Sequence, residues 1–441
     1  MPKGAISGLR VVELATGVAG PFCGKLFADY GADVIKVEPP GSGDGTRQWG
    51  PFRHDHPHPE KSGLFFFLNT NKRGVTLDPA AADGREQLRA LLAEADVLID
   101  SGSPRQQRAR GLDAAGLAQL NRRLVVISIT PFGQTGPYAE WKGYDLNAYH
   151  LSGGSSRYCG RPDDAPLEHG TFSADFFGGY VGATWGMAAA YGAQRTGVGG
   201  QVDVSCAEAI AALFVGAQNI GGYAQDGKFE KRSGIGMPLG APATILPCKD
   251  GYVWMMALEV GQWRGLRAAM GEPEWAQPEM FDDMFTRAQN ADMIYPFIEE
   301  WTTQRTKQEV MDLCQANGCP TTAVFTVGEV AEHPHTRQRG QIVEVVHPLM
   351  GTVRTLGAPI LLPACPGGPC RPAPLLGEHN ADVLGGGGDA RWRAEPRPRQ
   401  GAPVAFAGNG SHPLAGLRIA NFGWGWLGPV AGQTLSFLGA E

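Results

Sequence analysis

Short apolar runs alternate with longer segments of helical periodicity along the first 130 residues. Branched apolar residues are concentrated in five runs, each short enough for a buried strand: residues 9–15, 33–38, 75–78, 96–100 and 124–130. A glycine-bearing turn and an apolar segment of helical length separate the first two runs, so the chain begins with a βαβ unit. The alternation predicts an α/β domain with a parallel sheet.

The segment from residue 171 to 193 predicts a helix that is apolar on nearly every side, as expected of a helix buried within a domain. A single carboxylate, Asp175, stands near its start and is followed by Gly178 and Gly179. The unpaired N–H groups of a helix N-terminus can hold a carboxylate in its charged form, and the glycines would let a substrate approach the backbone. A helix cap is the commoner role for an acidic residue placed here, and the motif alone does not separate the two.

Changes in composition predict the domain organisation. We expect a large domain over residues 1–221, a charged and glycine-bearing connector over 222–239, and a small α+β domain over 240–335. Residues 342–360 predict a β-hairpin, and residues 386–413 have the composition of a linker.

The end of the chain repeats its beginning. Residues 416 onward match residues 8 onward at a constant offset of 408 positions. The matched pairs include Gly17 with Gly425, Gly20 with Gly428, Pro21 with Pro429, and Gly24 with Gly432. Gapless identity at so many special positions exceeds what two unrelated strand–turn–helix units would share. We therefore expect residues 414–441 to be the start of a truncated second repeat in a tandem protein.

Composition and charge narrow the classes of partner. The 441 residues include 38 Lys and Arg against 44 Asp and Glu, a net charge of −6, which disfavours nucleic acids and anionic membranes. The sequence contains no segment typical of a membrane span or a signal peptide, so we expect a cytoplasmic protein with reduced cysteines. His54, His56 and His58 lie in a proline-containing polar segment, which favours a solvated loop over a metal site, and we expect no metal.

The spacing of the glycines in the first turn disfavours one common cofactor. Gly17, Gly20 and Gly24 do not have the GxGxxG spacing, so a nicotinamide dinucleotide is poorly supported. Two basic segments, residues 69–74 and 105–111, suit an anionic ligand that carries phosphates. Solvated surface charge is the favoured explanation of either segment when it is taken alone.

Taken together and in order, several motifs resemble the family III CoA-transferases, which include formyl-CoA and carnitine CoA-transferases and the related α-methylacyl-CoA racemase. The resemblance covers about residues 7–385. It rests on GLRVVELATGVAGPF, GADVIKVEPPGSGD, NTNKRGVTLD, ADVLID, ITPFGQTGPYAEWKGYDLNAYHLSGG, ADFFGG and PLLGEH. It implies a Rossmann-like large domain, a small domain, and a return of the chain to the large domain over residues 336–385. It also implies that two such chains interlock, as a homodimer or as a pseudo-dimer with a second tandem copy.

The resemblance implies that Asp175 is a nucleophile. Its carboxylate would attack the thioester of an acyl-CoA, and the reaction would pass through a mixed anhydride and an aspartyl-CoA thioester. Coenzyme A would then be a substrate, together with a carboxylic acid, and no cofactor would be bound permanently. Gly178 and Gly179 are candidates for oxyanion donors. Asp145 matches a second acidic position that would orient the site, and a helix cap is its alternative role.

The resemblance also implies which residues contact CoA. The matching positions are Val18, Ala19, Asn71, Lys72 and Lys142, with either Arg108 or Arg110 as the arginine after ADVLID. Pro39 stands where formyl-CoA transferase has an arginine. Residues 233–238 are a shorter and bulkier counterpart of its glycine-rich lid, so small acids such as oxalate are not expected as acceptors.

Racemisation is the alternative reaction on the same fold, because an Asp and a His on opposite faces of a carbon can exchange its proton. The racemase carries that His in a GHD-type segment. Here the segment is GYD, with Tyr144 at the position, and His150 does not match it. Transfer is therefore favoured, and a catalytically silent scaffold within a tandem protein is the alternative from another class.

Overall fold

The computed structural model describes residues 4–441 apart from 159, 213–220, 229–230, 233, 235, 238–239, 386–390, 395–411 and 426. The chain divides into two compact units. The larger contains Met1–Gly154, His169–Gln225 and Gln338–Glu441, and the smaller contains Ser155–Glu168 and Asp226–Arg337. Half of the predicted lid counterpart, residues 233–238, and most of the predicted linker fall outside the described residues.

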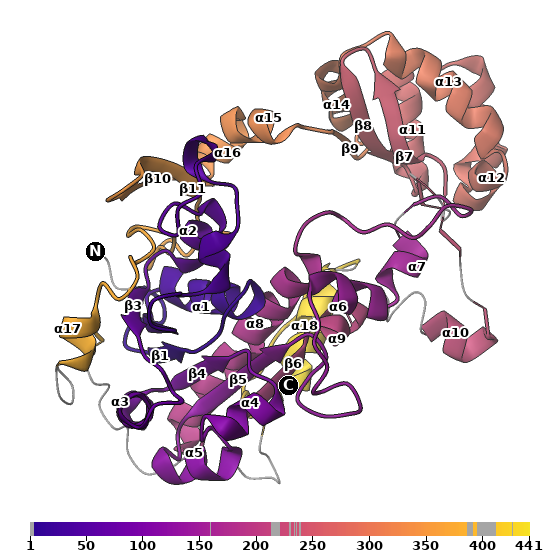
Figure 1. Cartoon of the computed structure of the whole chain (residues 1–441). Helices are drawn as coiled ribbons and strands as arrows, with labels where there is room; N and C mark the ends of the chain where they lie inside the picture. The colour runs from indigo at the N-terminus through magenta and orange to yellow at the C-terminus, as the bar shows by residue number, and fades with distance from the viewer. Residues whose placement is uncertain are drawn as a thin grey trace. The chain divides into compact units, whose positions relative to one another are not determined.

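Within the described residues of the larger unit, a parallel sheet of six strands forms the centre, which confirms the predicted α/β class (Figure 1). The strands are β1 Arg10–Glu13, β2 Asp33–Glu38, β3 Arg73–Thr76, β4 Val97–Asp100, β5 Val125–Thr130 and β6 Gly200–Ser205. Their order across the sheet is β3-β2-β1-β4-β5-β6, as in doubly wound α/β domains. The order reverses between β1 and β4, and in such sheets ligands bind at the carboxyl ends of the strands at that point.

The five runs of apolar residues in the first part of the chain correspond to β1 to β5. β1 is the central strand, and all of its residues are buried because β2 and β4 pair with its two edges. β6 was not predicted. It lies at the edge of the sheet, and its first four residues are not fully buried, so it lacks the continuous apolar run that marks the interior strands.

Helices cover both faces of this sheet. On one face, α3 Ala82–Glu94 and α5 Ala114–Leu120 contribute leucines to a cluster with β1, β2 and β4. On the other face, α1 Ala19–Asp29 packs beside α8 Ser173–Thr196. This arrangement gives the larger unit its helix–sheet–helix layers.

The long helix α8 is confirmed, but the expectation that it is buried on every side is wrong. Its buried residues are all Gly and Ala, whereas Tyr180 and Tyr191 are more than 40% exposed. The small residues allow the helix to lie close to the sheet. A Cβ added at Gly186 would be 2.1 Å from Ile127 Cδ1.

After the smaller unit, the chain returns to the larger one through a hairpin. β10 Ile342–His347 and β11 Gly351–Leu356 pair antiparallel, which confirms the predicted hairpin. The hairpin packs on Phe65 and Phe66 of α2 Gly63–Asn69. Further on, α17 Asn380–Leu384 follows a segment that bonds to β3, where His379 N donates to Gly74 O at 2.9 Å.

Part of the predicted linker is packed against the larger unit. Trp392 is 6% exposed, and its Nε1 donates to Glu94 Oε2 at 3.0 Å. Residues 391–394 therefore pack locally against the larger unit although their composition is that of a linker.

The smaller unit has its own core. Within its described residues, three antiparallel strands, β7 Ala243–Cys248, β8 Gly251–Met256 and β9 Thr321–Ala323, pack with helices around the fully buried Trp263. Its helices include α11 Val260–Met270, α12 Met284–Gln289, α13 Ala291–Thr303, α14 Lys307–Ala316 and α15 Val327–Glu332. Arg287 is buried and donates to the carbonyl oxygens of Ala241 and Ala257, both at 2.6 Å.

The close approach of α8 to the sheet predicts the effect of a single methyl group. Alanine favours a helix over glycine by about 1 kcal/mol, but at Gly186 its methyl would overlap Ile127, and such overpacking costs about 1–3 kcal/mol or more. We expect Gly186→Ala to lower the free energy of unfolding measured by urea denaturation. Gly261→Ala in α11, where no atom lies within 4 Å of the added methyl, is the control and should not lower stability.

Candidate active site

The first turn of α1 rests directly on the first turns of α8 at the carboxyl edge of the sheet. The carbonyl oxygen of Ala19 lies 2.4 Å from the position that a Cβ would take on Gly179, and Phe22 lies against the same glycine. Val18 and Ala19, both predicted to contact CoA, are buried in this turn. The structure therefore brings the predicted CoA turn and the helix that carries Asp175 together.

Asp175 is the third residue of α8, so it does not occupy the N-cap position that the cap alternative requires. The N-cap residue, Phe172, makes no side-chain capping bond. Instead, Asp145, the first residue of α6 Asp145–Leu151, accepts a hydrogen bond from the backbone N of Asp175 at 3.0 Å. A side chain from another helix thus satisfies one of the free N–H groups at the start of α8.

The surroundings of Asp175 disfavour its charged form. Burial, and then the nearby charge of Asp145, raise the pKa of Asp175 to about 7. Burial and the same two carboxylates also raise the pKa of the Cys206 thiol well above its ordinary value. Cys206 begins α9 Cys206–Ile210 and was not predicted to belong to the site. The thiolate, which is the nucleophilic form of a cysteine, is therefore disfavoured at Cys206.

Gly178 and Gly179 are both buried within α8 and are used for packing. A Cβ on Gly178 would lie 2.5 Å from Cys206 Sγ, and one on Gly179 would meet Ala19. The two glycines therefore let α9 and α1 approach the residues that follow Asp175. Their role as oxyanion donors stays a prediction.

Aromatic side chains surround the start of α8, a grouping that no local sequence pattern predicts. Phe176, next to Asp175, packs edge-on against Phe22 of α1, with 4.9 Å between ring centroids. Phe172 stacks on Trp49, which follows β2, at 5.8 Å. These rings supply apolar surface beside the carboxylate.

Asn71 and Lys72 are buried, and protein groups already bond their side chains. Lys72 Nζ pairs with Glu13 Oε2 at 2.7 Å and donates to the carbonyl oxygen of Pro21 at 2.7 Å. Asn71 has a left-handed backbone with φ of 68°, and its amide donates to Asp29 Oδ1 at 2.7 Å. Because Pro21 lies in the first turn of α1, its bond to Lys72 holds that turn in place.

The other predicted CoA contacts have exposed positions. Lys142 is exposed, and Arg108, on α4 Pro104–Ala109, forms an exposed ion pair with Glu140 at 3.2 Å. Arg110 instead pairs with the buried Asp100 at 3.1 Å. Of the two arginines that the sequence left open, Arg108 has the more exposed side chain, 65% against 31% for Arg110.

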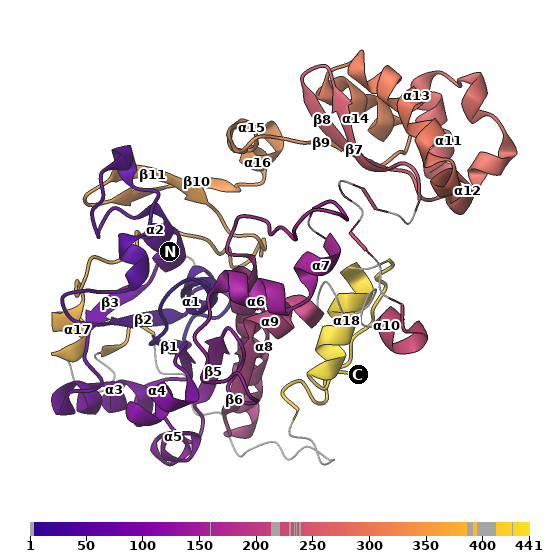
Figure 2. The same ribbon diagram turned by 45° about the vertical axis from the view of Figure 1, so that its right-hand side comes forward.

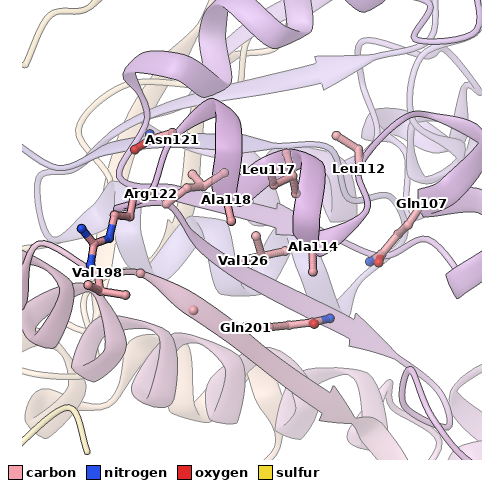
Figure 3. A pocket seen from close by; sticks show the side chains of 13 residues that line it. Gln107, Leu112, Ala114, Leu117, Ala118, Asn121, Arg122, Val126, Val198 and Gln201 are labelled. Atoms are coloured by element: carbon pink, nitrogen blue, oxygen red, sulfur yellow. The ribbon is translucent and has the colours of Figure 1, made fainter. Parts of the chain in front are cut away.

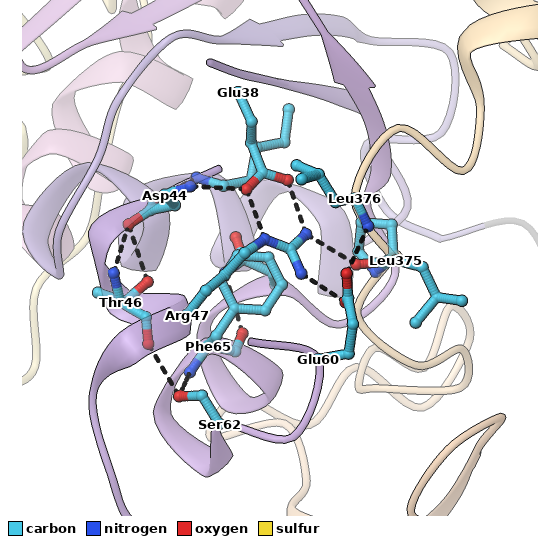
Figure 4. A network of polar contacts seen from close by, with 12 residues as sticks. Glu38, Asp44, Thr46, Arg47, Glu60, Ser62, Phe65, Leu375 and Leu376 are labelled. Carbon is cyan, nitrogen blue, oxygen red and sulfur yellow. Dashed lines mark hydrogen bonds and ion pairs between the residues drawn. The ribbon is translucent and has the colours of Figure 1, made fainter. Parts of the chain in front are cut away.

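A further buried network lies under the loop that follows β2 (Figure 4). The guanidinium of Arg47 bonds both carboxylate oxygens of Glu38, at 2.7 and 2.8 Å, and one of Glu60, at 2.6 Å. It also donates to the carbonyl oxygen of Pro374 at 3.1 Å. This side chain thus connects the loop to the segment that returns from the hairpin.

A family model described as CoA-transferase family III matches residues 6–380. The chain belongs to CoA-transferase family III. Homologues named as CoA-transferases identify it as an enzyme that acts on CoA thioesters and carboxylic acids. The succinate–glutarate CoA-transferase of Agrobacterium fabrum is 33% identical over 87% of this chain and 95% of that protein. A probable CoA-transferase of Mycobacterium tuberculosis is 33% identical over 95% of this chain but only 50% of that protein.

A solved structure supports the same assignment. The crystal structure of a CAIB/BAIF family protein from Brucella suis superposes with a TM-score of 0.76 and is 33% identical, covering 87% of this chain and 99% of that chain. In the described part of this CoA-transferase, no helix has the length and apolar character needed to cross a membrane. The same part contains no group of three or more His, Cys, Asp or Glu residues placed to hold a metal ion.

A cavity of about 370 Å³ in the larger unit of the transferase lies away from the carboxyl edge of the sheet (Figure 3). Leu117 and Ala118 of α5 form one wall, and Val126 of β5 and Gln201 of β6 form another. These strand residues lie at the amino ends of β5 and β6, whereas Asp175 lies at the carboxyl edge. The cavity is therefore separate from the candidate active site.

The raised pKa of Asp175 predicts a pH-dependent stability. The folded protein binds this proton more tightly than the unfolded chain, in which an Asp has a pKa of about 4. The free energy of unfolding therefore falls as pH rises from about 4 through about 7. Asp175→Asn stays neutral. Its melting temperature should exceed that of the wild type by an amount that grows between pH 5 and pH 8.

Asp145→Asn tests the second cause of that shift, because Asn keeps the acceptor oxygen but removes the charge. When Asn replaces Asp145, the increase in melting temperature caused by Asp175→Asn should grow less with pH than it does in the wild type. A difference in melting temperature that does not change with pH would contradict the proposed environment of Asp175.

The burial of Lys72 predicts a structural role for its charge. Lys72→Met leaves Glu13 with one fewer cation, and breaking a buried pair typically costs about 3–5 kcal/mol. We expect a loss of that order in the free energy of unfolding. Arg108→Met breaks an exposed pair worth about 0–1 kcal/mol and is the matched control. Equal small losses in both variants would show that Lys72 does not hold the first turn.

Proposed function

We propose that this enzyme transfers CoA from a donor acyl-CoA to an acceptor carboxylic acid and that Asp175 is the nucleophile. The observation that carries the proposal is the placement of Asp175. It is a partly buried carboxylate in the first turn of α8, next to the first turn of α1, at the edge of the sheet where ligands of doubly wound domains bind.

The reaction begins when the Asp175 carboxylate attacks the thioester carbonyl of the donor. The C–S bond breaks, CoA leaves as a thiolate, and a mixed anhydride joins the donor acid to Asp175. The thiolate then attacks the aspartyl carbonyl, so the donor acid leaves as a carboxylate and an aspartyl-CoA thioester remains.

The second half of the reaction reverses these steps with the acceptor. The acceptor carboxylate attacks the aspartyl thioester and releases the thiolate, which then attacks the acyl carbon of the acceptor. Asp175 is regenerated as a carboxylate, and no water is consumed. Aromatic rings beside Asp175 favour this outcome, because an anhydride or thioester exposed to water would be hydrolysed.

The raised pKa of Asp175 serves this chemistry. A carboxylate of ordinary pKa is a weak base and a weak nucleophile, whereas a carboxylate near pKa 7 is more basic and still substantially ionised at neutral pH. The charge of Asp145 contributes to the shift, and its bond to the Asp175 backbone orients the turn. We assign Asp145 as a positioning residue.

We propose that CoA lies across the first turn of α1, at Val18 and Ala19, and that Arg108 and Lys142 contact its phosphates. Arginine and lysine are suited to phosphate groups, and both side chains are exposed. Asn71 and Lys72 would contribute from beneath the turn, by holding it in place.

We further propose that the transferase acts in the cytoplasm and pairs with another copy of the fold, as a homodimer or as a pseudo-dimer within a tandem protein. The family resemblance supports pairing. The relative from Mycobacterium tuberculosis, of which this chain covers 50%, is consistent with the tandem form.

The test is to trap the covalent intermediate. Protein is incubated with succinyl-CoA, with and without glutarate, and then analysed by intact mass and peptide mapping, before and after hydroxylamine. We expect an adduct of CoA on the wild type that maps to Asp175, is cleared by glutarate and is converted to a hydroxamate by hydroxylamine.

Asp175→Asn should carry no adduct and should lose transfer activity, while Asp145→Asn should form the adduct more slowly. An adduct on another residue, or full activity of Asp175→Asn, would overturn the assignment. If succinyl-CoA gives no adduct, a panel of other acyl-CoAs is tested, and exchange of an α-proton without any adduct would favour racemisation.

A further inference from the structure

The last 30 residues reproduce the backbone hydrogen bonds of the N-terminal βα unit. Several bonds recur at the offset of 408 positions with nearly the same lengths, and four pairs illustrate them. They are Ile6 N to Tyr30 O (3.1 Å) and Leu414 N to Leu438 O (2.9 Å); Leu9 N to Ile6 O (3.2 Å) and Leu417 N to Leu414 O (3.1 Å); Ala32 N to Phe27 O (3.0 Å) and Ala440 N to Leu435 O (3.1 Å); and Asp33 N to Leu9 O (2.9 Å) and Glu441 N to Leu417 O (2.8 Å).

Helix bounds and glycine conformations match in the same way. α18 Leu427–Phe437 begins and ends 408 positions after α1, and both helices are 11 residues long. Gly17 and Gly425 have φ of 82° and 72°, and Gly31 and Gly439 have φ of 106° and 96°. These left-handed values favour glycine at both ends of each helix.

One side-chain contact is preserved in shape but not in charge. A Cβ on Gly24 would lie 1.8 Å from Glu13 Oε2, and a Cβ on Gly432 would lie 2.2 Å from Asn421 Nδ2. Glycine thus makes room for the side chain at the end of the strand in both units. The carboxylate that pairs with Lys72 in the first unit has become a neutral amide in the second.

The buried charges of α1 are lost as well. Lys25 pairs with Asp29 at 2.7 Å in α1, and Gln433 and Phe437 stand at these positions in α18. α18 therefore has an uncharged pair of side chains where α1 has a buried ion pair, so no buried charge has to be compensated there.

The repeated unit, drawn in yellow in Figures 1 and 2, packs on α8 mainly through residues on either side of α18. Leu414, Leu438 and Ala440 are buried in a cluster with Ala188 of α8. A Cβ on Gly192 would lie 2.9 Å from Pro413. A cavity of about 360 Å³ remains between α8, β6, α9 and α18.

We infer that residues 412–441 are the first βα unit of a second copy of the large-unit fold and that the outer side of α8 is the surface on which this copy docks. α8 packs against α1 with its glycines near Asp175 and against the repeated unit with its later turns. The docking surface is thus built into the helix that carries the proposed nucleophile.

The repeated strand positions support this inference. Residues 10–13 of β1 are buried between β2 and β4, whereas the matching residues 418–421 are exposed. Strands of the second copy that correspond to β2 and β4 would cover them. Ile419 and the strongly exposed Phe422 are apolar positions in this segment, which suits such a cover.

The test separates docking from covalent attachment. A protease site is inserted between residues 400 and 401 of the full chain, the protein is cleaved, and gel filtration with mass spectrometry reports whether the C-terminal fragment stays bound. We expect wild-type fragments to elute together. Release of the fragment from the wild type would overturn the docking.

Two variants test the surface from opposite sides. Gly192→Leu places a side chain on α8 where Pro413 lies, and Leu438→Asp puts a charge into the buried cluster. We expect both to release the fragment after cleavage. Thr184→Leu and Ser436→Asp, at exposed positions of α8 and α18, are the controls and should leave the C-terminal fragment bound. Retention in Gly192→Leu would contradict the assigned surface.

Hydrogen exchange tests the repeat independently of docking. The amides of Ala440 and Glu441 should be protected, like those of Ala32 and Asp33, because they make the matching bonds. Exchange of Ala440 and Glu441 at the rate of an unstructured peptide would show that the repeated unit does not form.

Discussion

The buried ion pairs beneath the first turn of α1 are the interaction on which the rest of the site depends. Lys36 bonds Glu13 at 3.0 Å and Asp44 at 2.8 Å, and Lys72 pairs with the second oxygen of Glu13. All four side chains are almost fully buried, so loss of one partner would leave an uncompensated charge in the protein interior. The charges therefore hold the ends of β1 and β2 in one arrangement, together with the turn between β1 and α1.

That arrangement determines where the helices begin. Lys72 bonds the carbonyl oxygen of Pro21, and the turn so held rests on Gly179 of α8. Asp145 bonds the other side of the first turn of α8. The start of the helix is thus supported by two separate elements, and Asp175 lies between them in surroundings that raise its pKa. Positioning of this kind is what a weak nucleophile such as a carboxylate requires.

The same helix also provides the surface against which the C-terminal unit packs. α8 carries small residues along much of its length, and these allow close contact with β5 and α1 on one side and with Pro413 at its later turns. A repeated βα unit that has lost the buried charges of the first can use this surface. Asp175 and the residues that approach Pro413 are several turns apart along α8, so a single helix can make both sets of contacts.

The sequence by itself determined the first five strands of the sheet, the return hairpin, the similarity between the two ends of the chain, and Asp175 as the candidate nucleophile. These features are local, because periodicity, turn glycines and short motifs are set by neighbours along the chain. Only the tertiary structure decided that Lys72 and Asn71 bond protein groups, that Asp145 caps α8, and that Arg47 joins Glu38 to Pro374. In each case the partners are distant in sequence, up to 327 positions apart for Arg47 and Pro374, and no local pattern records which distant groups meet once the sheet has formed.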